Sequence, residues 1–249
     1  MREAMSRVIL CLGCHRSGTS LIARSLECLG AELGPRAKWS GPDNPDFAED
    51  QDILGVDQAA MYYALGTWDS PAPLDWYTLP TLIASNFATR VRGLVSERIS
   101  QYPIWALKEP RMARLLPFWR PLFESLEVEV SVVHAVRHPM AVARSLEKRN
   151  DIPIATGLNL WYEYTTRARE DADPMWKTVT TRYEKMMTDP VMQIERIGRA
   201  LGLEMNRVAA QSFERETVDI DLWHQGASHE ILPPKVQTLW QQVRREAMT

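Results

Sequence analysis

Residues 13–20 (Gly-Cys-His-Arg-Ser-Gly-Thr-Ser) bring two glycines, an arginine and three hydroxyl side chains together in one short segment. An apolar run, residues 8–12, precedes it, and an amphipathic helical pattern follows. A glycine loop between a buried strand and a helix presents backbone N–H groups to an anion. Because Gly13 and Gly18 have the spacing of a phosphate-binding P-loop, we expect this segment to hold a phosphate group.

The loop lacks one part that an ATP-hydrolysing P-loop needs. Thr19 stands where the lysine would follow the last glycine, and the positive charge is at Arg16 instead. Such enzymes also bind Mg²⁺ through an aspartate at a strand end, but the apolar strands before Lys108 and Arg137 end in a base. A sulfuryl group carries less charge than a phosphoryl group, and Arg, Lys and N–H donors can stabilise its transfer without a metal. The pattern therefore indicates an anion site and predicts no metal site.

Five segments, in the same order, resemble motifs of the bacterial sulfotransferases that use 3′-phosphoadenosine 5′-phosphosulfate (PAPS). They are residues 14–20 (the 5′-phosphosulfate loop), 44–50 (Asn-Pro-x-x-x-Glu-Asp), 108–111 (Lys-Glu-Pro-Arg for the family's Lys-Asp-Pro-Arg), 136–146 (the 3′-phosphate motif) and 182–186 (Arg-Tyr-Glu-Lys-Met for Arg-Tyr-Glu-Asp-Leu). The resemblance spans about residues 8–205. It implies a PAPS-dependent enzyme and assigns roles to particular residues.

The resemblance implies that the loop holds the 5′-phosphosulfate through N–H groups, hydroxyls and a guanidinium. The residues concerned are His15, with its backbone N–H, and Arg16, Ser17, Gly18, Thr19 and Ser20. The structural alternative is a tight strand-to-helix turn that binds nothing. Two glycines, a base and three hydroxyls in one turn favour the anion site.

For the other end of the cofactor, the resemblance implies that Arg137 and Ser145 bind the 3′-phosphate. An arginine fork matches the oxygens of a phosphate. Tyr183 would stack on the adenine or border it. The alternatives are a surface arginine in an exposed turn and a tyrosine that belongs to the core.

Lys108 and Glu49 are the expected catalytic pair. Lys108 would lie beside the bridging oxygen, where negative charge grows as the bond breaks, and Glu49 would take the proton of the acceptor hydroxyl. Lys108 could also simply end a strand. Glu49 and Asp50 could equally be acids at a helix start, where they suit the helix dipole, so Asp50 or a histidine stays open as the base.

Other charged and titratable residues receive weaker expectations. Arg111 either orients the acceptor or pairs with Glu109. His134 lies inside an apolar strand and is expected to be a core histidine with its hydrogen bonds satisfied. His224 and His229 are minor alternatives for the base.

Composition limits the possible partners. The chain has 249 residues, enough for one domain over 1–249, and a net charge of −3, which gives no indication of nucleic-acid binding. The three cysteines, Cys11, Cys14 and Cys28, are expected to be thiols. No apolar stretch approaches the ~18 residues of a membrane span, and no leader is visible, so we expect a cytoplasmic protein with no membrane contact.

The hydrophobic pattern predicts an α/β fold. Strands are expected at 8–12, 104–108, 129–136 and 178–182, and helices at 18–29, 49–65, 82–101, 111–117, 118–125, 140–149, 156–171, 189–202 and 233–247. Short apolar strands between helices form a parallel sheet covered on both faces, a P-loop NTPase-like three-layer sandwich. Gly13, Lys108, Arg137 and Arg182 all follow or end such strands, and the C-terminal strand ends are where ligands bind in these folds.

The sequence thus predicts a sulfotransferase that moves a sulfuryl group from PAPS to a hydroxyl of a small-molecule or carbohydrate acceptor. A catalytically silent nucleotide-binding module is the main alternative, and a metal-dependent small-molecule kinase is a lesser one. The loops at 33–47 and 66–81 and the C-terminal region are expected to border the acceptor. They carry no pattern that names the acceptor, and oligomeric state is not indicated.

Overall fold

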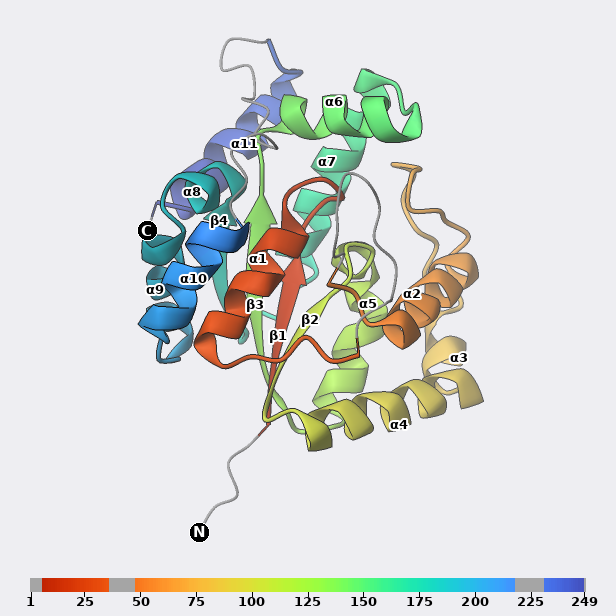
Figure 1. The fold of residues 1–249 in the computed structure, drawn as a ribbon. Helices are drawn as coiled ribbons and strands as arrows, with labels where there is room; N and C mark the ends of the chain where they lie inside the picture. The colour runs from red at the N-terminus through yellow and green to blue at the C-terminus, as the bar shows by residue number, and fades with distance from the viewer. Residues whose placement is uncertain (1–5, 36–47, 218–230, 249) are drawn as a thin grey trace.

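A computed structural model describes residues 6–35, 48–217 and 231–248. In this part of the chain, parallel strands pair in the order β2-β1-β3-β4 (Figure 1). The strands are β1 (Arg7–Leu12), β2 (Ile104–Lys108), β3 (Glu129–Val136) and β4 (Lys177–Arg182). Their C-terminal ends share one edge, where the register pairs Cys11 with Lys108 and Val136 with Arg182. The predicted parallel sheet is confirmed, and so is the meeting of its basic strand ends.

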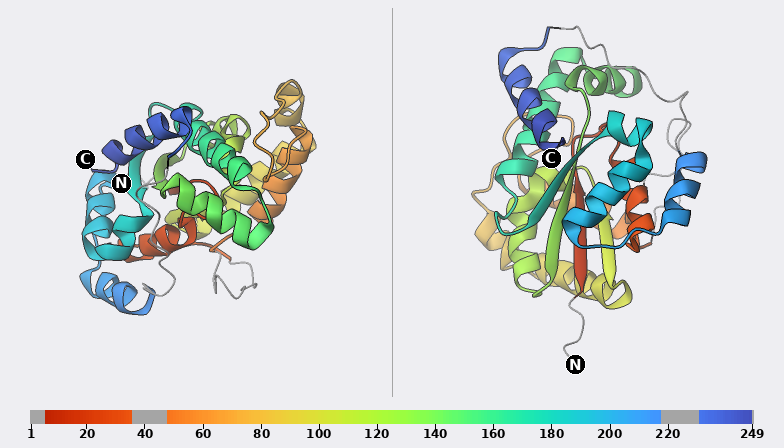
Figure 2. Two further views of the ribbon diagram at one scale, coloured as in Figure 1. Left: turned by 90° about the horizontal axis from the view of Figure 1, so that it is seen from above. Right: turned by 90° about the vertical axis from the view of Figure 1, so that its left-hand side faces the viewer.

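Helices cover both faces of the sheet, as the two views in Figure 2 show. One face packs against α1 (Thr19–Ser25), the 3₁₀ helix η1 (Leu26–Leu29), α8 (Tyr183–Thr188), α9 (Pro190–Leu201) and α10 (Arg207–Thr217). The other packs against α2 (Gln51–Tyr63), α3 (Leu79–Ile83), α4 (Asn86–Gln101), α5 (Met112–Glu124), α7 (Ile154–Glu170) and α11 (Pro234–Glu246). The remaining helix, α6 (Pro139–Asn150), crosses above the strand ends (Figure 1). Among the described helices, none has the length and apolar character to cross a membrane.

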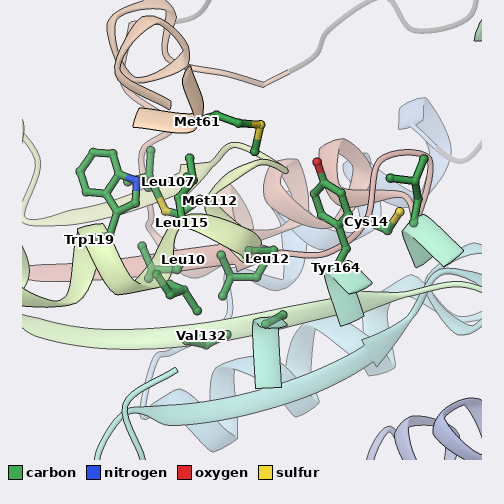
Figure 3. Close-up of a cluster of buried hydrophobic side chains, with 14 of the residues drawn as sticks. Leu10, Leu12, Cys14, Met61, Leu107, Met112, Leu115, Trp119, Val132 and Tyr164 are labelled. Atoms are coloured by element: carbon green, nitrogen blue, oxygen red, sulfur yellow. The ribbon is translucent and has the colours of Figure 1, made fainter. Parts of the chain in front are cut away.

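The alternation of side chains along each strand divides the core into two clusters. Ile9 and Cys11 face α1 and α9, whereas Leu10 and Leu12 face α5 and α7. In the second cluster, Trp119 of α5 and Met61 of α2 pack near the sheet, and Tyr164 lies beside Cys14 at the loop end (Figure 3). This packing holds α2 against α5 and β2, and so sets the position of the residues at the start of α2.

Helix α5 differs from the sequence expectation of two short helices. It is continuous over Met112–Glu124 although it contains Pro117 and Pro121. Each proline removes an N–H donor and disfavours a helix interior by ~3 kcal/mol. Phe118 and Trp119 are both fully buried here, and burying such side chains stabilises by ~1.5–3 kcal/mol each. Tertiary packing therefore overrides the local helix breakers.

Other element boundaries also differ. The expected helix over 82–101 is two helices, because Ser85 caps α4 by accepting a hydrogen bond from the Ala88 N–H. The expected helix over 18–29 tightens into a 3₁₀ turn after Ser25. Helices α8 and α10 were not predicted. The segment 36–47, which contains part of the Asn-Pro motif and Trp39, and the histidines 224 and 229 lie outside the described residues.

Candidate functional site

The glycine loop after β1 is shaped by two close approaches. A Cβ on Gly13 would lie 2.4 Å from the carbonyl oxygen of Ala135 in β3. A Cβ on Gly18, which has φ 80°, would lie 2.2 Å from Cδ2 of Tyr183. Arg16 has φ 67°, a left-handed conformation that a non-glycine residue rarely adopts. The loop is therefore held between β3 and Tyr183, and it turns sharply at Arg16.

Hydroxyl groups line the inside of this loop. Ser17 and Thr19 are buried, and Ser20 is partly exposed. Within the described residues, the Ser17 Oγ has no hydrogen-bond partner. Buried polar atoms are nearly always hydrogen-bonded, so the Ser17 hydroxyl fits a loop whose partner is a ligand.

Arg137 directly follows β3 and is buried. Its Nη1 donates to the Arg16 carbonyl oxygen at 3.2 Å, and its guanidinium carbon lies 4.4 Å from the centre of the Tyr183 ring. Its own carbonyl oxygen accepts a hydrogen bond from Trp161 Nε1 at 3.0 Å. Burial lowers the pKa of Arg137 while Tyr183 and Glu184 oppose the shift. An arginine nevertheless stays protonated in proteins, so this guanidinium is charged.

The two predicted anion sites are in direct contact. Arg16 Nε donates a hydrogen bond to the Ser145 Oγ of α6 at 2.8 Å. The sequence assigned the Arg16 guanidinium to the 5′ end of the cofactor and Ser145 to the 3′ end. The structure places the Arg16 side chain beside the 3′ motif, and leaves the Ser17 hydroxyl and the loop backbone at the other end.

Lys108 and Glu49 face each other at the end of β2. The Lys108 Nζ lies 2.5 Å from the Glu49 Oε1, and both side chains are largely buried. Asp50, the next residue, caps α2 by accepting from the N–H groups of Asp52 and Ile53. Its other oxygen accepts from Arg98 Nε at 2.8 Å. Asp50 is thus held in a structural ion pair, whereas Glu49 contacts the lysine of the predicted catalytic pair.

His15 contributes more than its backbone N–H. Its ring lies 4.7 Å from that of Trp68 and meets the ring of Tyr164 edge-on at 5.5 Å. Burial lowers the pKa of His15, and the charges of Arg111 and Lys108 lower it further. The neutral imidazole therefore packs between the loop and Trp68. No local pattern in the sequence pointed to this contact.

His134 is in the core, as expected, but the expectation that its hydrogen bonds are satisfied is wrong. The residue is buried in β3, and within the described residues neither ring nitrogen has a hydrogen-bond partner. The three cysteines are free and buried. In the described part of the chain, no group of three His, Cys, Asp or Glu side chains is placed to hold a metal ion.

An arginine that the sequence analysis did not single out fixes the loop between α2 and α3. Arg114 of α5 is almost fully buried, and it donates to three backbone carbonyls of this loop. The acceptors are the carbonyl oxygens of Thr67, Ser70 and Ala72. The Tyr164 hydroxyl donates to the Trp68 carbonyl oxygen at 2.9 Å. The sequence does contain a pattern that could have indicated this buried arginine, because Arg114 is a charged residue within the apolar face of α5.

Glu184 joins the ends of β3 and β4. Its Oε1 accepts from the His138 N–H at 2.8 Å, and its Oε2 lies 3.4 Å from Arg182 Nε. The indole of Trp240, on α11, packs against both His138 and Arg182. The C-terminal helix therefore supports the turn that carries Arg137.

The parallel sheet, the two helical layers and the glycine loop after β1 define a P-loop-like α/β protein, with basic residues gathered at one edge of its sheet. Solved structures with this fold include the sulfotransferase domain from the Synechococcus PCC 7002 olefin synthase and the sulfotransferase domain from the curacin biosynthetic pathway. The first has a TM-score of 0.58 and 15% sequence identity, and the alignment covers 98% of this chain and 96% of the olefin synthase domain. The second has a TM-score of 0.54, is 15% identical and covers 98% and 99%. No curated protein matches the chain in sequence.

The sulfotransferase family model matches residues 8–207. The chain belongs to the sulfotransferase family, as its motifs indicated, and its predicted three-layer fold is confirmed. Family membership favours a sulfotransferase over the kinase alternative.

Proposed function

We propose that this protein transfers a sulfuryl group from PAPS to a hydroxyl of a small-molecule or carbohydrate acceptor. Family membership supports the transferase. The donor is inferred from the motif resemblance and from one observation above all: Arg16 contacts both Ser145 and Arg137. This contact joins the glycine loop to the second anion motif, as a ligand with phosphate groups at both ends requires.

The residues present suit such a ligand. Arg137, Ser145 and the Arg16 side chain would hold the 3′-phosphate, because arginine and hydroxyl donors match its oxygens. The Ser17 hydroxyl, which lacks a partner among the described residues, would bind the 5′-phosphosulfate together with His15 N–H, Gly18, Thr19 and Ser20. One face of the Tyr183 ring is covered by Arg137, so we propose that Tyr183 borders the adenine with its edge.

Lys108 and Glu49 would carry the chemistry. A bond forms between the acceptor oxygen and sulfur while the bond from sulfur to the bridging oxygen breaks, and PAP (adenosine 3′,5′-bisphosphate) leaves. Glu49 takes the hydroxyl proton, and Lys108 stabilises the charge that grows on the bridging oxygen. The two side chains form an ion pair with each other. We propose that the donor's negative charge competes for Lys108 and so frees the Glu49 carboxylate to accept the proton.

The same ion pair keeps the silent nucleotide-binding module as a second candidate, since a base locked onto a lysine would not act. Two measurements separate the candidates. Calorimetry with PAP tests binding, and sulfur-labelled PAPS with alcohols, phenols and sugars tests transfer. We expect PAP to bind and labelled product to form. Binding without product across the panel would favour the silent module, and a failure to bind PAP would overturn both.

A further inference from the structure

One edge of the Arg111 guanidinium has no hydrogen-bond partner among the described residues. Its Nη1 donates to Glu109 Oε1 at 2.5 Å, and its backbone N–H donates to Oε2 of the same carboxylate at 3.0 Å. Within the described residues, its Nε and Nη2 have no hydrogen-bond partner, yet neither is among the buried polar atoms that lack one. The side chain is 14% exposed, so the guanidinium is not fully enclosed.

The free nitrogens form a fork. Nε and Nη2 lie on the same side of the planar guanidinium, and their two N–H groups point in parallel. This edge matches the two oxygens of a carboxylate, which an arginine binds with two parallel hydrogen bonds. A lysine at this place would offer no such geometry.

Arg111 lies on the acceptor side of the proposed reaction. It lies three residues after Lys108, the end of β2, whose Nζ contacts Glu49, the proposed base. It also interacts electrostatically with Glu49, His15 and Tyr164. The groups that bind or face Arg137 are instead Arg16, Tyr183, Glu184 and Trp161. The Arg111 fork thus belongs to the neighbourhood of the base, where the acceptor hydroxyl must be, and not to the 3′-phosphate site.

Two buried carboxyl groups, those of Glu109 and Asp57, lie on the Nη1 side of the Arg111 guanidinium. Glu109 and Asp57 of α2 are both buried, and their carboxyl groups interact electrostatically. The Asp57 Oδ1 also accepts from Trp119 Nε1 at 2.6 Å. Two buried carboxyls in contact cannot both be ionised. Burial and Glu109 raise the pKa of Asp57 well above its ordinary value. Burial also raises the pKa of Glu109, but Arg111 and Asp57 oppose that shift, so Asp57 carries the proton and Glu109 carries the single charge that faces Arg111.

We propose that Arg111 binds a carboxylate of the acceptor, with Glu109 and Asp57 as positioning residues, so that the acceptor is a hydroxy acid. The inference rests on the proposed function, because it places the acceptor hydroxyl at Glu49 and the acceptor carboxylate at Arg111. It narrows the acceptor from any alcohol or sugar to compounds that carry both groups.

Matched acceptors that differ only in charge test the proposal. We would measure kcat/KM for para-hydroxybenzoate and β-hydroxybutyrate and for their methyl esters, with PAPS as donor. The wild-type protein should favour the acid of the better pair about tenfold or more, the size expected for charged hydrogen bonds. Arg111→Gln should remove this preference by slowing the acid alone, with PAP affinity unchanged. Equal use of acid and ester, or an equal loss on both in Arg111→Gln, would overturn the proposal.

The positioning pair has its own readout. Asp57→Asn keeps an oxygen for Trp119 and supplies an N–H toward Glu109, as a protonated Asp57 does, so it should retain the preference for the acid. Asp57→Ala should lose the preference. Loss in Asp57→Asn as well would contradict the protonated role.

The failure of the proposed function is distinguishable from the failure of this inference. If PAP does not bind, the donor assignment falls, but calorimetric titration of para-hydroxybenzoate into the ligand-free protein still probes Arg111. Binding that Arg111→Gln removes, and that the methyl ester lacks, would support the carboxylate site. Absence of carboxylate binding to both the PAP-loaded and the ligand-free protein would overturn it. Arg111→Lys serves as a second variant should Arg111→Gln fold poorly, and it should retain only part of the preference because it lacks the fork.

Discussion

Both the side chain and the backbone carbonyl of Arg16 hydrogen-bond to the predicted 3′-phosphate motif (136–146), which lies far away in the sequence. Its side chain donates from Nε to the Ser145 hydroxyl at 2.8 Å, and its carbonyl oxygen accepts from Arg137 at 3.2 Å. The left-handed backbone of Arg16 accompanies this double contact. The glycine loop and the turn before α6 are therefore one site, and a change in either half should affect the binding of a ligand that spans both.

Arg137→Ala should weaken the binding of PAP by about 10- to 100-fold. The variant removes a charge-assisted partner of the 3′-phosphate, and such hydrogen bonds contribute ~1.5–3 kcal/mol. Calorimetry with PAP measures the loss, and adenosine 5′-phosphate provides the comparison, because it lacks the 3′-phosphate and should lose much less affinity. Lys148→Ala is the control, since Lys148 is an exposed cation on α6, the helix that follows Arg137. Equal losses in both variants would show a general charge effect in place of a specific contact.

Gly18→Ala should destabilise the fold more than Gly30→Ala. Both glycines have a positive φ, 80° and 78°, so both substitutions carry the left-handed cost of ~1–2 kcal/mol. At Gly18 the new Cβ also meets the Tyr183 ring, whereas at Gly30 nothing lies within 4 Å. We expect Gly18→Ala to cost ~1–3 kcal/mol more, by analogy with overpacked cores. Urea unfolding of the two variants measures the difference, and equal midpoints would contradict the contact.

The strands and the basic residues at their ends could be predicted because each depends on a local pattern. A largely apolar run such as 130–136 marks a buried strand, and Arg137 follows it in the sequence. The shared edge then follows from parallel pairing, which needs no knowledge of side-chain contacts.

Contacts between distant residues could not be predicted in the same way. Tyr183 packs on Gly18, and the His15 ring packs on Trp68, because the fold brings these elements together. The helix propensity of proline likewise favours a break within α5, but the helix is continuous because tertiary packing buries Trp119. The role of Asp57 in particular depends on a carboxyl of another element, which no spacing in α2 reveals.

Glu49→Gln and Asp50→Asn should have opposite effects. Glu49→Gln removes the proposed base, so kcat should fall by about 10²–10⁴-fold, the range for general base catalysis, while PAP affinity is kept. Asp50→Asn should leave the chemistry intact and cost ~3 kcal/mol of stability, because it removes the buried charged partner of Arg98 and leaves only the exposed carboxylates of Asp52 and Glu97. Rate assays with saturating donor and urea unfolding separate the two outcomes. A large fall of kcat in Asp50→Asn, measured with saturating donor, would indicate that Asp50 is the general base and Glu49 is not.

His134 should make the protein less stable in acid. Burial in β3 lowers the pKa of His134 to about 3, and the charge of Arg169 contributes. The unfolded chain titrates near the ordinary value of ~6.5. As the pH falls from ~6.5 toward 3, the unfolded state binds a proton that the native state does not, so stability drops by ~1.4 kcal/mol per pH unit, or about 2 kcal/mol at pH 5. His15 and His138, whose pKa values are also lowered, add to the total slope. The difference between the wild-type protein and His134→Leu isolates the contribution of His134. The free energy of unfolding, measured from pH 7 to pH 5, should fall less steeply in the variant, whereas parallel curves would show that His134 gains its proton in the native state.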